Sequence, residues 1–137
     1  MLNPATLLLV LIVFTTVTTV LMVMAALPAD ALAEQRLWAQ GNVAASLGFA
    51  VGALTDYHPL VHAGLSYGLI GLGMALVLRG LRRFCGADLS ALAVGGIALG
   101  ALLLPAWFAW VQPDKGARLI VSGLYLGALS FWSAAIL

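Results

Sequence analysis

The stretch ATLLLVLIVFTTVTTVLMVMAAL, residues 5–27, contains no charged side chain and is followed at once by Pro28. A helix of about 20 apolar residues is long enough to cross the hydrocarbon core of a bilayer. A charge at the centre of that core costs about 2.5–3.5 kcal/mol even on the lenient insertion scale. The stretch therefore predicts a transmembrane helix.

The same pattern recurs along the whole chain. The 6 basic and 5 acidic residues all lie outside the uncharged stretches 1–29, 37–55, 57–78, 89–113 and 119–137. Charged residues make up 8% of the chain, whereas a soluble domain has about 25%. We therefore expect one all-α domain over residues 1–137, a polytopic bundle of five transmembrane helices at about 5–27, 37–54, 60–78, 89–111 and 119–137.

The net charge and the cysteine count limit the classes of function that the chain can have. A net charge of +1 argues against a nucleic-acid partner, and the single cysteine, Cys85, cannot form an intrachain disulfide. The segment Ala31-Leu32-Ala33 resembles a signal-peptidase site, but residues 1–4 carry no basic side chain. The apolar run before it is also longer than the roughly 7–15 residues of a signal-peptide core. These features favour a retained helix over a cleaved signal peptide.

The basic residues predict an orientation. The first and third connections carry four arginines, Arg36, Arg79, Arg82 and Arg83. The second and fourth connections carry the other two basic residues, Lys115 and Arg118. Because basic residues gather on the cytoplasmic side, the four arginines are expected to anchor the topology, with the amino terminus outside and the carboxyl terminus in the cytoplasm.

The last apolar stretch suggests a longer protein. At 1.5 Å per residue, residues 119–137 form a helix of about 28 Å, which barely crosses a core of about 30 Å. No basic residue or glycine follows it in this sequence. We expect the chain to be part of a longer protein whose remainder begins on the cytoplasmic side.

Small residues recur four positions apart. The pairs are Gly48/Gly52, Gly64/Gly68, Gly96/Gly100 and Gly123/Gly127. Such pairs let helix backbones approach closely in lipid, where no hydrophobic force drives helices together. They are predicted helix-packing positions, with chance among 15 glycines as the alternative.

Polar residues and a proline interrupt the apolar helices. Four threonines crowd the first helix, Thr15, Thr16, Thr18 and Thr19. Their hydroxyls are expected to bond to carbonyls of the preceding turn, although they would also suit a small polar cavity. Asn42 and Gln40 need partners if they are buried, and interhelical hydrogen bonds are expected for them. Pro105 removes one backbone hydrogen bond, so a kink and a candidate hinge are predicted there.

One segment combines residue types that bind metals. Asp56, His58 and His62 lie close together, and the histidines are four residues apart. They are candidate ligands for a metal or haem, or an external pH sensor, since histidine titrates near pH 6.5. Pro59 lies between the histidines, and a zinc site needs three or four ligands. Interfacial histidines bonded to the loop backbone are the competing interpretation.

Residues 64–68, GLSYG, spell the G-x-S-x-G pattern of a nucleophile elbow around Ser66. That motif works on a sharp turn between a strand and a helix. Within a continuous apolar helix the turn cannot form, so serine hydrolysis is not predicted.

Three stretches together resemble a known family. They are RLWAQGN at 36–42, LGMALVLRGLRRF at 72–84, and FAWVQPD at 108–114 followed by Arg118 and Ser122. In this order and spacing the chain resembles the amino-terminal membrane region of bacterial diguanylate cyclases. Such regions have about seven helices, followed by a cytoplasmic GGDEF domain that makes cyclic di-GMP from two GTP. Related membrane regions precede histidine kinases.

The resemblance covers only the first five helices. The GGDEF motif, its GTP-binding residues and the last two helices are absent from this sequence. The chain alone therefore carries no predicted catalytic residue. The one cofactor considered is a metal or haem at His58 and His62. These two histidines are not part of the family pattern. The resemblance implies a sensory and anchoring domain in the bacterial inner membrane. Its implied partners are the bilayer, a cytoplasmic output domain after the carboxyl terminus, and a second copy through the full-length protein.

A freestanding small membrane protein is the alternative. It would be a subunit of a transporter or channel, or a protein that binds metal or haem. Transporters usually show internal repeats and charge within their spans, and neither is evident here. A sensory input region is therefore the preferred prediction.

Overall fold

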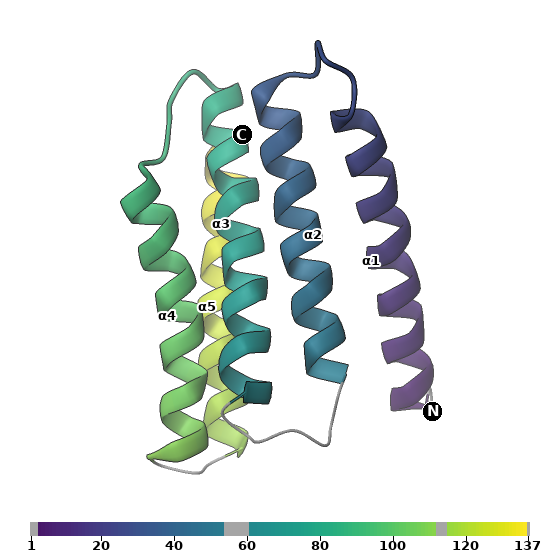
Figure 1. Ribbon diagram of the computed structural model, residues 1–137. Helices are drawn as coiled ribbons and strands as arrows, with labels where there is room; N and C mark the ends of the chain where they lie inside the picture. The colour runs from purple at the N-terminus through teal and green to yellow at the C-terminus, as the bar shows by residue number, and fades with distance from the viewer. Residues whose placement is uncertain (1–2, 54–60, 112–114, 137) are drawn as a thin grey trace.

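Five α-helices and one short π-helix make up the described part of the chain (Figure 1). The computed structural model describes residues 3–53, 61–111 and 115–136. The elements are α1 (Pro4–Ala26), α2 (Ala33–Ala53), η1 (Val61–Leu65), α3 (Ser66–Phe84), α4 (Ala91–Trp110) and α5 (Lys115–Ile136). These described residues contain no strand. The predicted all-α bundle is confirmed.

Helix ends extend further into the charged segments than the sequence pattern suggested. α2 begins at Ala33 and so includes Glu34 and Arg36, while α5 begins at Lys115. α3 runs on to Phe84 through the arginine cluster. Glu34 near the start of α2, and Arg82 and Arg83 near the end of α3, interact favourably with the dipoles of their helices. Long arginine side chains also reach water from within the last turns of a membrane helix.

The connection between α3 and α4 has well-defined caps. Gly86 adopts a φ of 82°, a left-handed conformation that favours glycine. Its N–H donates to the carbonyl of Arg83 at 3.0 Å, and the N–H of Ala87 donates to that of Arg82 at 2.9 Å. These two bonds form a Schellman cap. Ser90 caps α4, because its Oγ accepts the backbone N–H of Ala93 at 3.2 Å.

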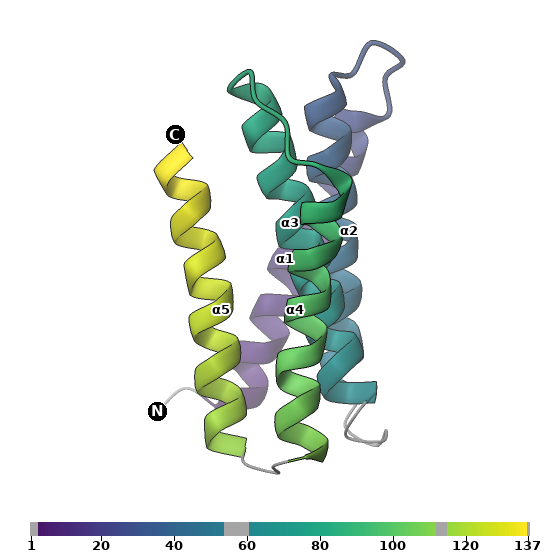
Figure 2. The same cartoon turned by 90° about the vertical axis from the view of Figure 1, so that its left-hand side faces the viewer.

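The helices pack mainly in chain order. α1, α2 and α3 lie side by side in Figure 1, with α4 against α3. α5 packs against α3 and α4, and Figure 2 shows it on the side of the bundle away from α2. α1 packs against α2 and against no other described helix. The described ends of α1 and α5 that lie nearest the chain termini are at opposite ends of the bundle (Figure 1).

Within the described residues, three helices are long and apolar enough to cross a membrane. The segments are Leu9–Ala26, Ala63–Phe84 and Ala91–Trp110, and a shorter apolar segment covers Leu119–Ala135. α1 is apolar on all sides and none of its membrane-length segment is buried, which is typical of a helix that faces lipid. α2 does not meet the same criterion, because Glu34, Arg36, Gln40 and Asn42 make it more polar. Crossing by all five helices stays a prediction.

Candidate functional site

The most extensive contact between helices in the described part of the chain joins α2 to α3. A Cβ atom on Gly41 would lie 2.7 Å from the carbonyl oxygen of Gly73, and one on Gly73 would lie 2.5 Å from the carbonyl oxygen of Gly41. Real Cβ atoms essentially never approach another atom closer than 3.0 Å. The two backbones therefore meet at a point where only glycine fits on either side, as in other close helix pairs in lipid.

The eight predicted glycines differ in how closely a neighbouring helix approaches them. Four of them would place a Cβ within 3.1 Å of an atom in another helix, namely Gly48, Gly52, Gly68 and Gly100. A Cβ on Gly64 would make an ordinary contact of 3.8 Å with Ala106. The other three face open space with no described atom within 4 Å, namely Gly96, Gly123 and Gly127. Only the pair Gly48/Gly52 has both members packed closely against the same helix.

The sequence reasoning missed several contact residues of this interface. Gly41, Gly73 and Gly80 make close contacts but belong to no pair of glycines four apart on the same face. A pattern of alternating four and three residues would have found them. On α2 this pattern gives Trp38, Gly41, Ala45, Gly48 and Gly52; on α3 it gives Ser66, Ile70, Gly73, Val77 and Gly80. This repeat of 3.5 residues is typical of helices that keep one seam in contact over several turns. We call these ten residues the α2–α3 seam.

Hydroxyl groups add hydrogen bonds to the helix contacts. Ser66, the serine of the G-x-S-x-G pattern, is buried, and its Oγ donates to the carbonyl of Gly48 at 2.8 Å. Thr19 bonds to its own preceding turn at 2.7 Å and lies 2.7 Å from the Oγ of Ser46 on α2. The other three α1 threonines also bond to preceding carbonyls, at 2.7–2.9 Å, so the predicted back-bonding is confirmed. Asn42 is only half-buried, and its side chain donates within its own helix, to the carbonyl of Trp38 at 2.9 Å. The condition for the predicted interhelical bond, burial of Asn42, is therefore not met.

The four arginines predicted as topology anchors lie at one end of the bundle, where α2 begins and α3 ends (Figure 1). Arg83 Nε lies 3.6 Å from the carboxylate of Glu34, which joins α3 to α2. Arg36 donates to the carbonyl of Ala29 at 3.2 Å, and Arg82 lies in the last turn of α3. This end also holds Trp38, whose ring centroid is 6.2 Å from that of Phe84. Their role as anchors stays a prediction.

Arg79 makes the best-defined ion pair of the described residues. Its Nε and one terminal nitrogen donate to the two carboxylate oxygens of Asp88 at 3.1 and 3.3 Å. The backbone N–H of Leu89 also donates to Asp88, at 2.8 Å. The hydrogen bond from Arg79, more than any other interaction, lowers the pKa of the Asp88 carboxyl below its ordinary value of 3.8. Asp88 thus ties the start of α4 to the end of α3 while it is ionised.

Acid is expected to weaken the ion pair between Arg79 and Asp88, because it protonates the Asp88 carboxylate. Because the pKa of Asp88 is lowered in the folded state, its contribution to stability is full above the ordinary carboxyl pKa of 3.8 and is lost as pH falls through the lowered value. The advantage of the native protein over Asp88→Asn should therefore shrink as pH falls from 5 toward 2. Unfolding in mixed micelles followed by circular dichroism measures this difference. A difference that stays constant with pH would contradict the assignment, and Asp30→Asn, outside any ion pair of the described residues, should follow the native curve.

The candidate metal ligands are only partly within the described structure. Asp56 and His58 lie outside the described residues, and His62 belongs to η1, although its side chain is not described. Within residues 3–53, 61–111 and 115–136, no group of three potential ligands could hold a metal ion. The metal, haem and pH-sensor hypotheses stay predictions.

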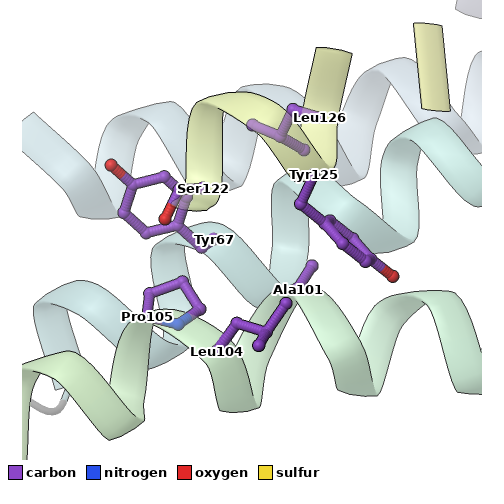
Figure 3. A pocket seen from close by; sticks show the side chains of 7 residues that line it. All are labelled: Tyr67, Ala101, Leu104, Pro105, Ser122, Tyr125 and Leu126. Atoms are coloured by element: carbon purple, nitrogen blue, oxygen red, sulfur yellow. The ribbon is translucent and has the colours of Figure 1, made fainter. Parts of the chain in front are cut away.

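Pro105 lies inside a continuous α4 and is fully buried. It lines a narrow pocket between α3, α4 and α5 that has no room for a water molecule. Figure 3 shows Tyr67, Pro105 and Ser122 grouped together, with the Tyr125 ring directed away from them. The Ser122 hydroxyl is buried and has no hydrogen-bond partner in the described part of the chain. The proposed hinge at Pro105 stays a prediction.

A hydrogen bond between described residues links α4 to α5. The hydroxyl of Tyr125 donates to the carbonyl of Ile97 at 2.8 Å, and it occupies the space beside Gly100. α5 otherwise presents many large apolar side chains outward, among them Leu124 and Phe131. It is therefore held more loosely than α2 and α3 hold each other.

No protein-family model matches this chain, and no curated protein or solved structure matches it either. Its function therefore has to follow from the residues and from their placement in the fold.

Proposed function

We propose that this chain is the membrane-embedded sensory and anchoring region of a bacterial signalling protein of the diguanylate cyclase type. The observation that carries the proposal is the order and spacing of the three stretches 36–42, 72–84 and 108–114, which resemble the membrane region of those enzymes. In this proposal the chain lies in the inner membrane with its amino terminus in the periplasm. The catalytic GGDEF domain belongs to the full-length protein and would lie in the cytoplasm.

The placement of two of these stretches supports the proposal. Residues 36–42 lie in the first half of α2, which begins at Ala33, and residues 72–84 form the end of α3, so the two stretches meet toward one end of the bundle. There Trp38 packs against Gly80 and Phe84, and Glu34 pairs with Arg83. The end of α5 lies toward the same end of the bundle (Figure 1). Two further membrane helices after α5 would bring the chain back to this end, so the output domain would lie beside the start of α2 and the arginine-rich end of α3.

The packing also suggests which helices move in the proposed mechanism. At the α2–α3 seam, backbone atoms of the two helices already touch, so sliding would drive one backbone into the other. α5 lacks such a seam, and Gly123 and Gly127 face open space. A stimulus would shift α5 relative to a rigid α2–α3 pair. The shift would change how two output domains meet in a dimer, which is a two-state coupling.

Tyr125→Phe tests this mechanism in the full-length protein. The variant removes the hydrogen bond between α5 and α4 but keeps the ring. Interhelical hydrogen bonds in membranes contribute about 0.6 kcal/mol, so basal cyclic di-GMP synthesis should change about threefold. Tyr67→Phe is the matched control, since its hydroxyl makes no hydrogen bond to another described residue. Equal synthesis by Tyr125→Phe and the native protein would contradict a role for α5 in coupling.

The coding sequence after residue 137 tests the function itself. The proposal requires two further membrane helices and then a GGDEF motif in the same reading frame. A stop codon directly after codon 137 would contradict it and would favour the freestanding alternative. A kinase domain in place of the GGDEF domain would keep the sensory role and replace the cyclase.

A further inference from the structure

A groove opens between α1 and α3. Both helices pack against α2 but not against each other, so α2 forms the floor of the groove and the other two helices form its walls. The groove has a volume of about 550 Å³, which lies within the usual range of ligand pockets. Its lining is apolar except at one end, where Arg36 and Gln40 lie. Typical wall and floor residues are Val23, Val43, Leu47 and Leu72.

The depth of the groove matches one leaflet of a bilayer. Its floor follows one stripe of α2 from Arg36 to Leu47, which is about 16 Å along the helix axis. The hydrocarbon core is about 30 Å thick, so the groove extends about halfway across it. An added transmembrane helix would need a groove along the full thickness. A hydrocarbon chain that enters from one leaflet needs only this half.

Arg36 supplies a cation at the mouth of the groove. The one hydrogen bond that its side chain makes within the described part of the chain goes to the carbonyl of Ala29, at 3.2 Å. This bond holds the guanidinium over the connection between α1 and α2 and uses one of its five N–H donors. Neither described ion pair includes Arg36: the nearby Glu34 pairs with Arg83, on the side facing α3. The remaining donors of Arg36 suit a phosphate, which guanidinium binds in a bidentate manner.

We propose that this groove is a binding site for an anionic phospholipid of the surrounding bilayer, with an acyl chain between α1 and α3 and its phosphate at Arg36. Apolar contact alone would not select a lipid, because lipid tails are as apolar as the leucines that line the groove. Selection comes from the charge at the mouth. The proposal requires only that the protein lies in a membrane, and it does not depend on the signalling role.

Lipid retention by the purified protein tests the site. Native mass spectrometry would compare the phosphatidylglycerol and phosphatidylcholine that remain bound after release from mixed micelles. One basic residue near a membrane surface contributes enough to change anionic-lipid binding about fivefold. Arg36→Gln should therefore lower the ratio of retained phosphatidylglycerol to phosphatidylcholine about fivefold. Arg82→Gln, at the same end of the bundle but outside the groove, should leave the ratio unchanged.

A second pair of variants tests the groove itself. Val43→Trp, which places an indole in the groove, should lower the retention of both lipids, whereas Leu103→Trp on the exposed face of α4 should not. Circular dichroism would verify that each variant is folded. Equal effects of Arg36→Gln and Arg82→Gln, or full lipid retention by Val43→Trp, would overturn the proposal. The proposal would also be overturned if the native protein were a dimer and Val43→Trp made it monomeric without loss of lipid. In that case a second copy of the chain would occupy the groove.

Discussion

Replacement of Gly73 by valine is expected to lower the free energy of unfolding by about 3 kcal/mol, at the upper end of the usual effect of overpacking. A Cβ atom there would lie 2.5 Å from the carbonyl oxygen of Gly41 and 2.9 Å from the backbone nitrogen of Ala45. Backbone atoms cannot rotate away as a flexible side chain can. The two helices would have to separate, and the hydrogen bond from Ser66 to Gly48 would weaken with them.

Unfolding by added sodium dodecyl sulfate in mixed micelles measures this loss, with circular dichroism as the signal. Gly96→Val is the matched control, because a Cβ on Gly96 meets no described atom within 4 Å. Substitutions at such surface positions usually change stability by less than about 0.5 kcal/mol. A similar loss in both variants would mean that valine acts through helix propensity, and the seam would then contribute little.

The sequence was sufficient for the helical class and for the approximate position of every helix. Uncharged stretches of membrane length are a strong signal, because lipid excludes charge and requires every backbone group to be bonded within the segment. The ends were less predictable. The sequence pattern places the ends at the charged residues, but Glu34, Arg79 and Lys115 lie within helices. The side chains of Glu34 and Arg79 are partly exposed, so they reach water from within the helix.

The contacts between helices were harder to predict, for a physical reason. In a uniformly apolar helix, lipid-facing and buried positions have the same hydrophobicity, so periodicity does not separate them. Glycine spacing identified Gly48 and Gly52 on the α2–α3 seam but also Gly123 and Gly127, which face open space. The centre of the seam, at Gly41 and Gly73, depends on which helix faces which. That pairing is a property of the fold and not of either helix alone.

The groove with Arg36 at its mouth was hidden from the sequence for a related reason. Arg36 was predicted to anchor the topology, as Arg82 was, and its neighbours along the chain give no sign of a groove beside it. The difference lies in packing. Among the described helices α1 contacts only α2, so an apolar space remains beside Arg36, whereas Arg82 lies outside that space. The charge of a side chain is read from the sequence, but the shape of the space next to that charge is not.

Replacement of Leu78 by alanine is expected to lower the free energy of unfolding by about 2 kcal/mol, near the lower end of the range for buried leucines. Leu78 is 1% exposed and packs with Ala75, Leu89 and Val94 beneath the connection between α3 and α4. The neighbouring backbone cannot collapse into the space, because the turn is held by the cap at Gly86 and by the ion pair of Asp88. A cavity would therefore remain.

The change in free energy of unfolding caused by Leu78→Ala reports on packing more than on the transfer of a side chain out of water. In a soluble protein the loss combines both, but here the unfolded helices also stay in an apolar phase, so mainly the cavity contributes. Leu92→Ala gives the comparison, since Leu92 is 89% exposed and should change stability by less than about 0.5 kcal/mol. Both variants can be measured by the same micelle unfolding. If Leu78→Ala and Leu92→Ala lowered the free energy of unfolding equally, lipid would fill the space beside α3 as well as the protein does. The cluster around Leu78 would then not hold α4 in place.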